Sequence, residues 1–260
     1  MLVLRPGALG DTLLALPALR ALRRRFGRVI LAAHGGAARL LADLGEVDEG
    51  WAFDDPRLGW VFGGPPPAEP VVAWMDATHA PGVRDALLVA PSRPSDQWHC
   101  AEHLVQTLAP LGIPPVVDAA PLRVEPWPSS DILVHPGSGS AAKNWPAEQF
   151  AELIQHLGQV RLIVGEADAA AADAVERRVG HALPRLIEPP LVELAQRLAG
   201  CRAYVGNDSG VSHLAGLVGA RSFVLFGPTS PTIWRPLGPF VSVLSFEASP
   251  KQLAENVLAS

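Results

Sequence analysis

The chain has 260 residues, of which 48% are hydrophobic and 18% charged, a composition typical of a globular protein and not of a disordered one. Its formal net charge of -5 disfavours a general nucleic-acid-binding surface. Cys100 and Cys201 are far apart in the sequence and lack metal-ligand spacing, which argues against a disulfide framework and indicates a reducing compartment.

The apolar N-terminal stretch is interrupted by Arg5, Pro6 and Asp11, so it does not resemble a signal peptide. No window approaches the roughly 20 consecutive apolar residues that a membrane-spanning helix requires. We therefore expect a soluble, cytoplasmic protein.

The first half of the chain predicts a strand at residues 1–5, a turn at residues 7–11 and a helix to about residue 26. Pro17 should start or kink this helix, because proline lacks the N–H that an interior turn needs. Positive charges gather at its end, at Arg20, Arg23, Arg24 and Arg25. They indicate a solvated helix end, with peripheral contact to the anionic inner face of a membrane as the alternative. Further strands are expected at residues 29–33, 71–74 and 87–90, and helices at residues 37–44 and 96–111.

A proline-rich stretch with no strong periodicity follows, with prolines at positions 114, 115, 121, 126 and 128. We place a domain boundary here and expect an acceptor-side lobe at residues 1–120 and a nucleotide-binding lobe at residues 121–260. Beyond the boundary, strands are predicted at residues 132–135, 161–164, 185–187, 203–205 and 222–226, and helices at residues 146–157, 169–179, 191–199 and 211–218. This alternation predicts α/β lobes with parallel sheets, in which ligands bind at the carboxyl ends of the strands.

One such end is the turn Gly206-Asn207-Asp208-Ser209-Gly210, which joins a buried strand to a helix. Its unpaired backbone N–H groups and the positive helix end suit an anionic ligand, and Gly210 allows close approach. Asp208 or Ser209 serving only as a helix cap is the alternative. His213, in the first turn of the helix, is either a ligand contact or a core histidine.

The loop after the strand at residues 132–135 contains Gly137, Ser138, Gly139 and Lys143 before a helix at Pro146. Small residues, hydroxyls and a lysine suit a diphosphate; an ordinary flexible loop is the alternative. Gly137-x-Gly139-x-x-Ala142 also matches a dinucleotide fingerprint, but weakly, because Pro146 suggests that the helix begins after Ala142.

Three further acidic or histidine positions have two interpretations each. Glu166 either contacts ribose hydroxyls or begins a solvated helix. Asp11, after Gly7 and Gly10 in the first turn of the chain, is a helix cap or a general base. His99 and His103 have i, i+4 spacing, but no third ligand is apparent nearby, so we expect no metal. We likewise expect no cofactor.

Taken in order, these loops resemble glycosyltransferase family 9, the heptosyltransferases of lipopolysaccharide core synthesis. The resemblance rests on Arg5-x-Gly7-Ala8-Leu9-Gly10-Asp11 with Pro17; His99-x-x-Glu102 before Leu111-Gly112; His135-Pro136-Gly137 leading to Lys143-Asn144-Trp145-Pro146; Gly206-Asn207-Asp208-Ser209-Gly210 with His213-Leu214-Ala215; and Phe226-Gly227-Pro228-Thr229. It spans nearly the whole chain.

The resemblance implies a GT-B architecture, with two Rossmann-like lobes facing a cleft, and an inverting, metal-independent transfer from a nucleotide-activated sugar, with ADP-heptose favoured. By position, Asp11 is similar to the family's catalytic base. The donor-site positions it implies are Ser138, Lys143, Glu166, Asp208, Ser209, Gly210 and His213. The partners implied are a nucleotide-diphosphate sugar and a glycan or glycolipid acceptor, and no nucleic acid is expected.

The chain is shorter than is typical of that family, and the loss falls in the first lobe. Residues 51–70 offer Asp54, Asp55 and Glu69 against Arg57, a poor surface for a phosphorylated lipid. Two other functions therefore stay open. One is a non-catalytic nucleotide-sugar-binding module, and the other is an NAD-dependent oxidoreductase built on Gly137-x-Gly139-x-x-Ala142.

Overall fold

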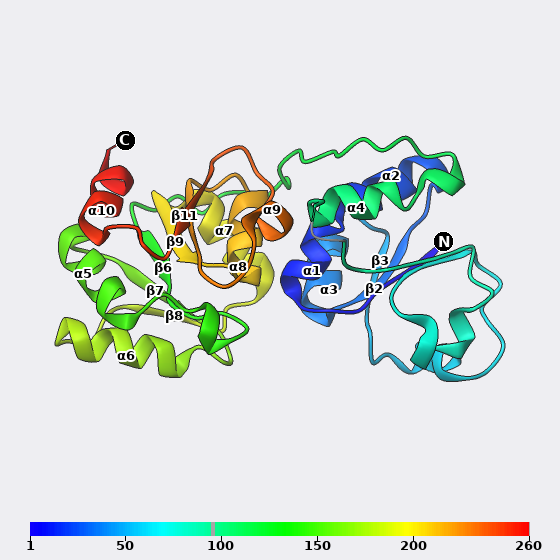
Figure 1. Cartoon of the computed structure of the whole chain (residues 1–260), viewed down its shortest axis with the longest axis horizontal. Coiled ribbons are helices and arrows are strands. Elements are labelled where there is room, and N and C mark those ends of the chain that lie inside the picture. Colours follow the sequence, from blue (N-terminus) through cyan, green and yellow to red (C-terminus); the bar gives the residue numbers. More distant parts are fainter. Residues whose placement is uncertain (95–96, 260) are drawn as a thin grey trace. The chain divides into compact units, whose positions relative to one another are not determined.

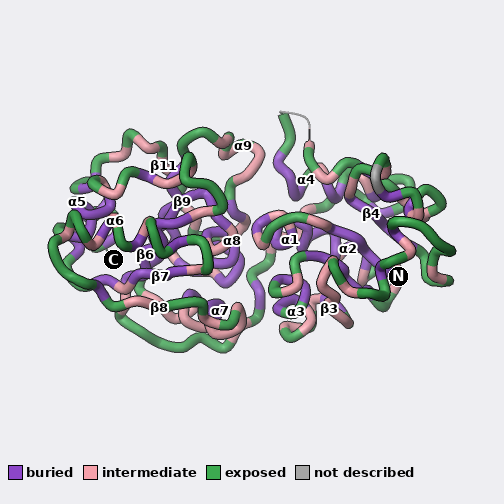
Figure 2. The backbone as a smooth tube through the Cα atoms, turned by 90° about the horizontal axis from the view of Figure 1, so that it is seen from below, coloured by how far each residue is buried: buried purple, intermediate pink, exposed green. Residues whose placement is uncertain are grey.

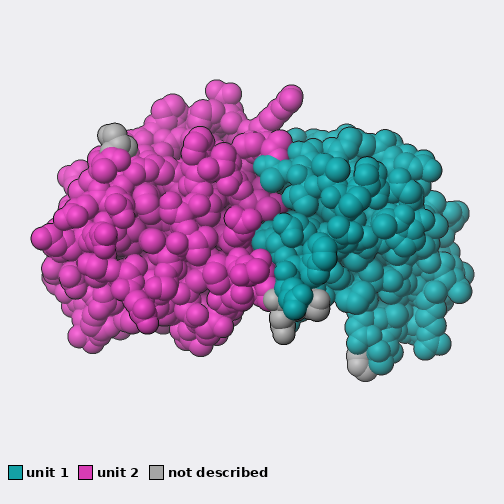
Figure 3. Space-filling view, turned by 45° about the horizontal axis from the view of Figure 1, so that its top comes forward, with its two compact units in different colours: residues 1–119 teal, residues 120–260 magenta. Residues whose placement is uncertain are grey.

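The computed structural model describes residues 1–94 and 97–259 (Figure 1). The chain forms two compact units, Met1–Ala119 and Ala120–Ser260, which are coloured separately in Figure 3. Each unit has its own parallel β-sheet flanked by helices, which confirms the expected α/β class.

The first unit is built on a parallel sheet with the strand order β3-β2-β1-β4-β5. Its strands are β1 (Leu2–Arg5), β2 (Ile30–Ala33), β3 (Glu49–Ala52), β4 (Val71–Trp74) and β5 (Leu88–Ala90). Every residue of β1, β2 and β4 is buried, as expected of short apolar strands covered on both faces. The edge strand β3, which the sequence did not predict, is only half-buried.

The helices of the first unit differ from expectation at their ends. They are α1 (Leu9–Leu14), α2 (Leu16–Phe26), α3 (Gly35–Asp43) and α4 (Cys100–Gln106), with 3-10 helices at Pro56–Phe62, Ala77–His79, Pro81–Val83 and Ala109–Leu111. The expected helix ending at residue 26 is divided at Ala15, and Pro17 lies in the first turn of the second part, where a missing N–H is harmless.

The helix expected at residues 96–111 is shorter than predicted. It begins at Cys100, because the His99 ring nitrogen Nδ1 accepts the Ala101 N–H and caps it. Residue 96 itself lies outside the described residues. The α-helix ends at Gln106 and a 3-10 turn containing Pro110 follows, so the prediction was wrong at both ends.

Most of the arginines at the end of α2 are paired with carboxylates of their own unit. Arg20 binds Glu46 at 2.6 Å and Asp118 at 3.5 Å, and Arg24 binds Asp118 at 2.8 Å. Arg23 binds Asp48 at 3.1 Å. These pairs are consistent with a solvated helix end, and contact with an anionic membrane surface stays a prediction. No helix among the described residues combines the length and apolar character needed to cross a bilayer.

The second unit is built on a parallel sheet with the strand order β11-β10-β9-β6-β7-β8. Its strands are β6 (Ile132–His135), β7 (Arg161–Val164), β8 (Arg185–Ile187), β9 (Ala203–Asn207), β10 (Ser222–Phe226) and β11 (Val241–Ser245). The central strands β6, β9 and β10 are buried throughout, and β6 and β9 are drawn in the burial colour in Figure 2. The site described below lies where these central strands end.

Helices cover the sheet of the second unit. They are α5 (Ala147–Leu157), α6 (Ala169–Val179), α7 (Leu191–Gly200), α8 (Gly210–Leu217), α9 (Pro231–Trp234) and α10 (Pro250–Leu258), with a 3-10 helix at Ala141–Lys143. One core contains β-strand residues together with apolar side chains of α5, α6 and α10. The elements after β10, namely α9, β11 and α10, were not predicted.

Candidate functional site

Four loops of the second unit meet at one edge of its sheet. Because β6, β7, β9 and β10 are parallel neighbours, the segments that follow them leave from the same edge. The strand order places the loop after β9 between the loops after β6 and β10. The site is therefore assembled from segments that are up to about 90 residues apart in sequence.

The turn after β9 forms the N-terminus of α8. Ser209 is the N-cap, and its Oγ accepts the Ser212 N–H at 3.4 Å, so Ser209 and not Asp208 performs the capping that the sequence left open. The N–H groups of Gly210 and Val211 have no hydrogen-bond partner among the described residues. These two groups point out of the positive end of α8 and suit an anion.

Asn207 ties this turn to the loop after β6. Its side chain is fully buried; Oδ1 accepts the Trp145 N–H at 2.9 Å, and Nδ2 donates to the carbonyls of Pro136 and Gly137 at 2.9 and 3.2 Å. Three hydrogen bonds therefore fix the two loops relative to each other. Sequence reasoning assigned Asn207 no such role.

A charged cluster lies at the same place. Lys143 Nζ is 2.9 Å from Asp208 Oδ2, and the Thr229 hydroxyl donates to that same oxygen at 2.8 Å. His213 Nε2 lies 4.0 Å from Asp208 Oδ1. The Asp208 side chain is only 5% exposed, so Lys143 compensates a nearly buried negative charge. The structure thus brings together Lys143, Asp208, Ser209 and His213, as the sequence predicted, and adds Thr229.

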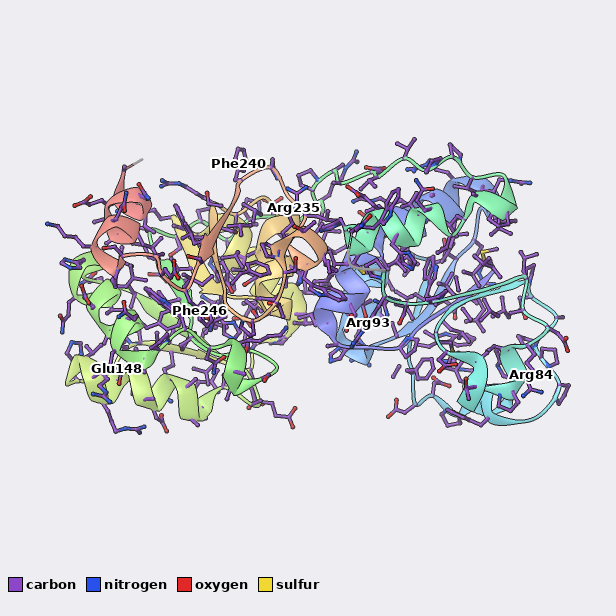
Figure 4. The ribbon with its side chains drawn as sticks, in the orientation of Figure 1. Arg84, Arg93, Glu148, Arg235, Phe240 and Phe246 are labelled. Atoms are coloured by element: carbon purple, nitrogen blue, oxygen red, sulfur yellow. The ribbon has the colours of Figure 1, made fainter. Side chains whose placement is uncertain are left out.

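The turn after β10, which contains Thr229, packs through Gly227 against Phe246, which follows β11 and is labelled in Figure 4. A Cβ on Gly227 would lie 2.4 Å from Phe246 Cε2, so only glycine allows this ring to pack against the turn. The Phe246 carbonyl also accepts the indole N–H of Trp145 at 2.9 Å. The residues after β11 therefore support two of the loops that form the site.

The loop after β6 contains the remaining predicted positions. The Ser138 hydroxyl lies 2.7 Å from both Asn144 Oδ1 and the Ser140 carbonyl, so it stabilises its own loop. Gly139 is exposed and a Cβ there would meet nothing within 4 Å. Ala142 lies in a 3-10 turn, and the next α-helix begins only at Ala147, so the dinucleotide fingerprint is not formed.

After β7, the structure favours a residue that the sequence analysis overlooked. Glu166 is exposed and stands outside the charged cluster, whereas Asp168, two residues later, is buried. Asp168 Oδ2 accepts hydrogen bonds from His135 Nε2 at 2.8 Å and from the Gly165 N–H at 2.9 Å. Burial raises the pKa of the Asp168 carboxyl, but these hydrogen bonds outweigh burial and hold it below its ordinary value.

In the first unit, Asp11 is the third residue of α1. Its Oδ2 accepts the Ala8 N–H at 2.9 Å, and its Oδ1 lies 3.3 Å from Arg5 Nη2. Arg5 is 1% exposed, whereas the Asp11 side chain keeps 21% of its surface in contact with solvent. The Cα of Gly7, at φ +138°, packs against the carboxylate. Asp11 is thus fixed in orientation, ion-paired and still accessible.

His99 and His103 do not act as a pair. His99 caps α4, and the His103 ring nitrogen Nε2 lies 2.9 Å from the Pro91 carbonyl. Within residues 1–94 and 97–259, no group of three or more His, Cys, Asp and Glu side chains could hold a metal ion.

Comparison with protein families identifies a match in the second half of the chain. The model of glycosyltransferase family 9 (heptosyltransferase) matches residues 118–259, more than half of the chain. Among curated proteins, the chain is 31% identical over 112 residues to lipooligosaccharide heptosyltransferase 2 of Haemophilus influenzae. It is 35% identical over 107 residues to lipopolysaccharide heptosyltransferase 1 of Pseudomonas aeruginosa. These segments cover 40% and 38% of this chain but only 32% and 29% of the two relatives.

Solved structures resemble the whole chain. A family 9 glycosyltransferase from Veillonella parvula has a TM-score of 0.79 at 18% identity, with 99% of this chain and 96% of that chain covered. E. coli ADP-heptose lps heptosyltransferase II has a TM-score of 0.75 at 20% identity, with 99% and 97% covered. E. coli heptosyltransferase WaaC with ADP has a TM-score of 0.73 at 18% identity, with 98% and 99% covered. At these identities the likeness establishes the fold, and it confirms the GT-B expectation.

Proposed function

Because the chain belongs to glycosyltransferase family 9, we propose that it transfers a sugar from a nucleotide-diphosphate donor to a hydroxyl of a glycan or glycolipid. The observation that carries this proposal is the convergence of Lys143, Asp208 and the N-terminus of α8 at one edge of the second sheet. A lysine beside free backbone N–H groups is suited to a diphosphate.

The second unit would bind the donor. The N–H groups of Gly210 and Val211 would donate to diphosphate oxygens, and Lys143 would neutralise part of their charge. When the diphosphate arrives, Lys143 can turn from Asp208 to it, because the lysine side chain is 33% exposed. Asp208 and His213 would then hydrogen-bond hydroxyls of the sugar. Glu166 and Ser138 remain weaker candidates for donor contacts.

The first unit would supply the base. Asp11 would accept the proton of the acceptor hydroxyl, while that oxygen attacks the anomeric carbon and the bond from this carbon to the diphosphate breaks. The departing diphosphate takes the electron pair, and Lys143 with the α8 N–H groups stabilises its added charge. A single displacement of this kind inverts the anomeric configuration. Lys143 also supplies the positive charge that a metal ion would otherwise provide.

ADP-heptose is the donor that the comparisons favour. One relative of known structure, E. coli heptosyltransferase WaaC, is described with ADP and with ADP-2-deoxy-2-fluoro heptose. Two relatives of known sequence are heptosyltransferases of lipopolysaccharide or lipooligosaccharide, which suggests a glycolipid acceptor and work in the cytoplasm, at the inner face of the membrane.

One property of the first unit bears on how many phosphate groups the acceptor carries. Arg57, the lone basic residue between positions 51 and 70, is bound to Asp55 at 2.7 Å and stacked 3.8 Å above the ring of Trp51. Its charge is therefore already compensated, and a strongly phosphorylated acceptor would find little attraction here. We infer an acceptor with fewer phosphate groups in its contact region.

A thermal-shift series with ADP-heptose, ADP, UDP and NAD tests the donor proposal. A ligand that binds only the folded state raises the melting temperature, and at equal concentration a tighter-binding ligand raises it more. We expect ADP-heptose and ADP to give the largest shifts. A larger shift from NAD would favour an oxidoreductase, and no shift from any nucleotide would overturn the proposed function.

A further inference from the structure

The second unit has a cavity at the edge of its sheet opposite the proposed donor site. Asp131, Arg161 and Cys201 line it, and they lie at or just before the first residues of β6, β7 and β9. The donor-site loops follow the last residues of these parallel strands, so they leave from the other edge. The cavity has a volume of about 260 Å³. Pockets for drug-sized ligands have roughly 300–1,000 Å³, so this cavity suits a molecule with a single ring.

One wall of the cavity is the segment that leads into β6. The Trp127 N–H donates to the Gln196 carbonyl of α7 at 2.9 Å. The Ser129 N–H donates to the Gly200 carbonyl at the end of the same helix, also at 2.9 Å. A Cβ on Gly200 would lie 2.1 Å from the Trp127 carbonyl oxygen, so only glycine allows this close approach. The segment is thus fixed against α7, and the 52% exposed Trp127 presents an apolar ring to a ligand.

The cavity has more hydrogen-bond donors than its walls use. Arg161 binds Asp131 Oδ2 through its Nε–H at 2.9 Å, and Arg197 binds Glu193 Oε1 in the same way at 2.8 Å. Within residues 1–94 and 97–259, the Nη1 and Nη2 groups of both arginines have no hydrogen-bond partner. The Arg197 guanidinium also lies 4.4 Å from the centroid of the Trp127 ring. Free N–H groups on two guanidinium forks suit the oxygens of a phosphate or carboxylate.

The two ion pairs leave these guanidinium groups available. The side chains of Arg161 and Asp131 are each 34% exposed, and those of Arg197 and Glu193 are 29% and 33% exposed. Ion pairs this accessible to solvent are weak, and each uses one N–H of its arginine. Both arginines can therefore bind a second acceptor without giving up the first.

Two further groups of the cavity narrow the class of ligand. Oδ1 of Asp131 has no partner in the described part of the chain, so it can accept a hydrogen bond from a hydroxyl. The Cys201 thiol donates to the Leu198 carbonyl at 3.1 Å, and burial raises its pKa to about 12, so it stays neutral and does not repel an anion. A ligand that matches these walls has an anionic group, hydroxyls and a ring with an apolar face.

We propose that this cavity is a second ligand site and that it binds a monosaccharide phosphate. Arg161 and Arg197 bind the phosphate, Asp131 accepts hydrogen bonds from sugar hydroxyls, and the Trp127 ring packs against the apolar C–H face of the sugar. A phosphate is favoured over a carboxylate because its three terminal oxygens can accept from both forks at once. The cavity and the proposed donor site have no residue in common, so this inference stands apart from the proposed function.

Calorimetric titration tests the site with glucose 6-phosphate as the probe and with inorganic phosphate and glucose as its two halves. We expect wild type to bind glucose 6-phosphate more tightly than inorganic phosphate and to show no measurable binding of glucose. Arg161→Met should weaken the binding of glucose 6-phosphate at least about tenfold, because hydrogen bonds to a charged group are lost. Trp127→Ala should weaken it about 2- to 10-fold and leave the binding of inorganic phosphate unchanged.

Arg178→Met is the matched control, because Arg178 is also paired with a carboxylate of the second unit, Glu148, but does not line the cavity. It should bind glucose 6-phosphate as wild type does. Lys143→Met separates the cavity from the donor site, where a phosphate could also bind, and it too should bind the probe as tightly as wild type.

Three outcomes would overturn the proposal. The first is weaker binding of glucose 6-phosphate by Lys143→Met with unchanged affinity in Arg161→Met and Trp127→Ala, which would place the phosphate at the donor site. The second is equal affinity of wild type for glucose 6-phosphate and inorganic phosphate, because the sugar would then contribute nothing. The third is no binding of glucose 6-phosphate by wild type, a result that does not depend on whether a variant folds.

Discussion

The ammonium group of Lys143 lies 2.9 Å from the carboxylate of Asp208, across a sequence separation of 65 residues. The Thr229 hydroxyl donates to the same oxygen, so Asp208 keeps one partner if the lysine is lost. The pairing therefore holds the ammonium group of Lys143 at the donor site when no ligand is bound. Removal of Lys143 should therefore weaken ligand binding and also lower the stability of the fold.

Lys143→Met should weaken ADP-heptose binding by about 10- to 150-fold, since a hydrogen bond to a charged group contributes about 1.5–3 kcal/mol. The free energy of unfolding should also fall, by about 1–3 kcal/mol, because the nearly buried Asp208 carboxylate loses its compensating charge and keeps the Thr229 hydroxyl. Calorimetry gives the affinities and urea denaturation the stability. Lys251→Met, on an exposed position of α10, is the control; equal affinities of the two variants would contradict this role of Lys143.

Gly137 and Gly139 provide a comparison within one loop. A Cβ on Gly137 would lie 1.9 Å from Asp168 Oδ1, whereas a Cβ on Gly139 would meet no atom within 4 Å. Gly137→Ala should lower the free energy of unfolding by about 1–3 kcal/mol, a typical effect of overpacking, and should weaken donor binding. Gly139→Ala should leave both unchanged. Equal free energies of unfolding of the two variants in urea denaturation would contradict this, because they would show that the Asp168 side chain moves aside without destabilising the fold.

The lowered pKa of Asp168 predicts that part of the free energy of unfolding is lost in acid. Its pKa in the folded protein lies below the ordinary value, so its contribution to stability is present above the ordinary value of about 3.9 and is lost as pH falls through the folded value. Asp168→Asn should be about 1–3 kcal/mol less stable at pH 7 and should lose less stability between pH 7 and pH 3 than wild type. Denaturation at both pH values measures this, with exposed Asp43→Asn as control. An unchanged pH dependence in Asp168→Asn would contradict the assignment.

The sequence predicted the parallel sheets and the main loops because buried parallel strands are continuous apolar runs. Residues 71–74 and 222–226 were assigned as the structure has them. Strand β3 was missed because Glu49-Gly50-Trp51-Ala52 is a half-buried edge strand with no apolar run. The family resemblance is confirmed by the match to residues 118–259.

The interior of the site was less predictable than its loops. Glu166 and Asp168 are both acids just before a helix, and only packing against His135 and Gly137 selects Asp168 for burial. The sequence analysis assigned His135 no contact of its own, although its ring nitrogen Nδ1 lies 3.2 Å from Ser209 Oγ. Side-chain contacts between residues more than 30 positions apart leave no periodic signal in the sequence.

Asp11 carries the catalytic part of the proposal. Asp11→Asn keeps an acceptor for Arg5, which would otherwise be a buried and unpaired charge. The variant should bind ADP-heptose as tightly as wild type, because the base acts on the acceptor and not on the donor. Transfer should fall about 10²- to 10⁴-fold, the usual contribution of a general base. Asp43→Asn, in the same unit, should behave as wild type in both respects.

The most direct measurement is the rate of ADP release from ADP-heptose in the presence of a heptose-deficient core glycolipid, compared between wild type and Asp11→Asn at donor saturation verified by calorimetry. The proposed function predicts acceptor-dependent release by wild type and a loss of at least about a hundredfold in the variant with unchanged donor affinity. Equal rates in the two proteins, or a loss of donor binding in Asp11→Asn that accounts for the slower rate, would contradict it.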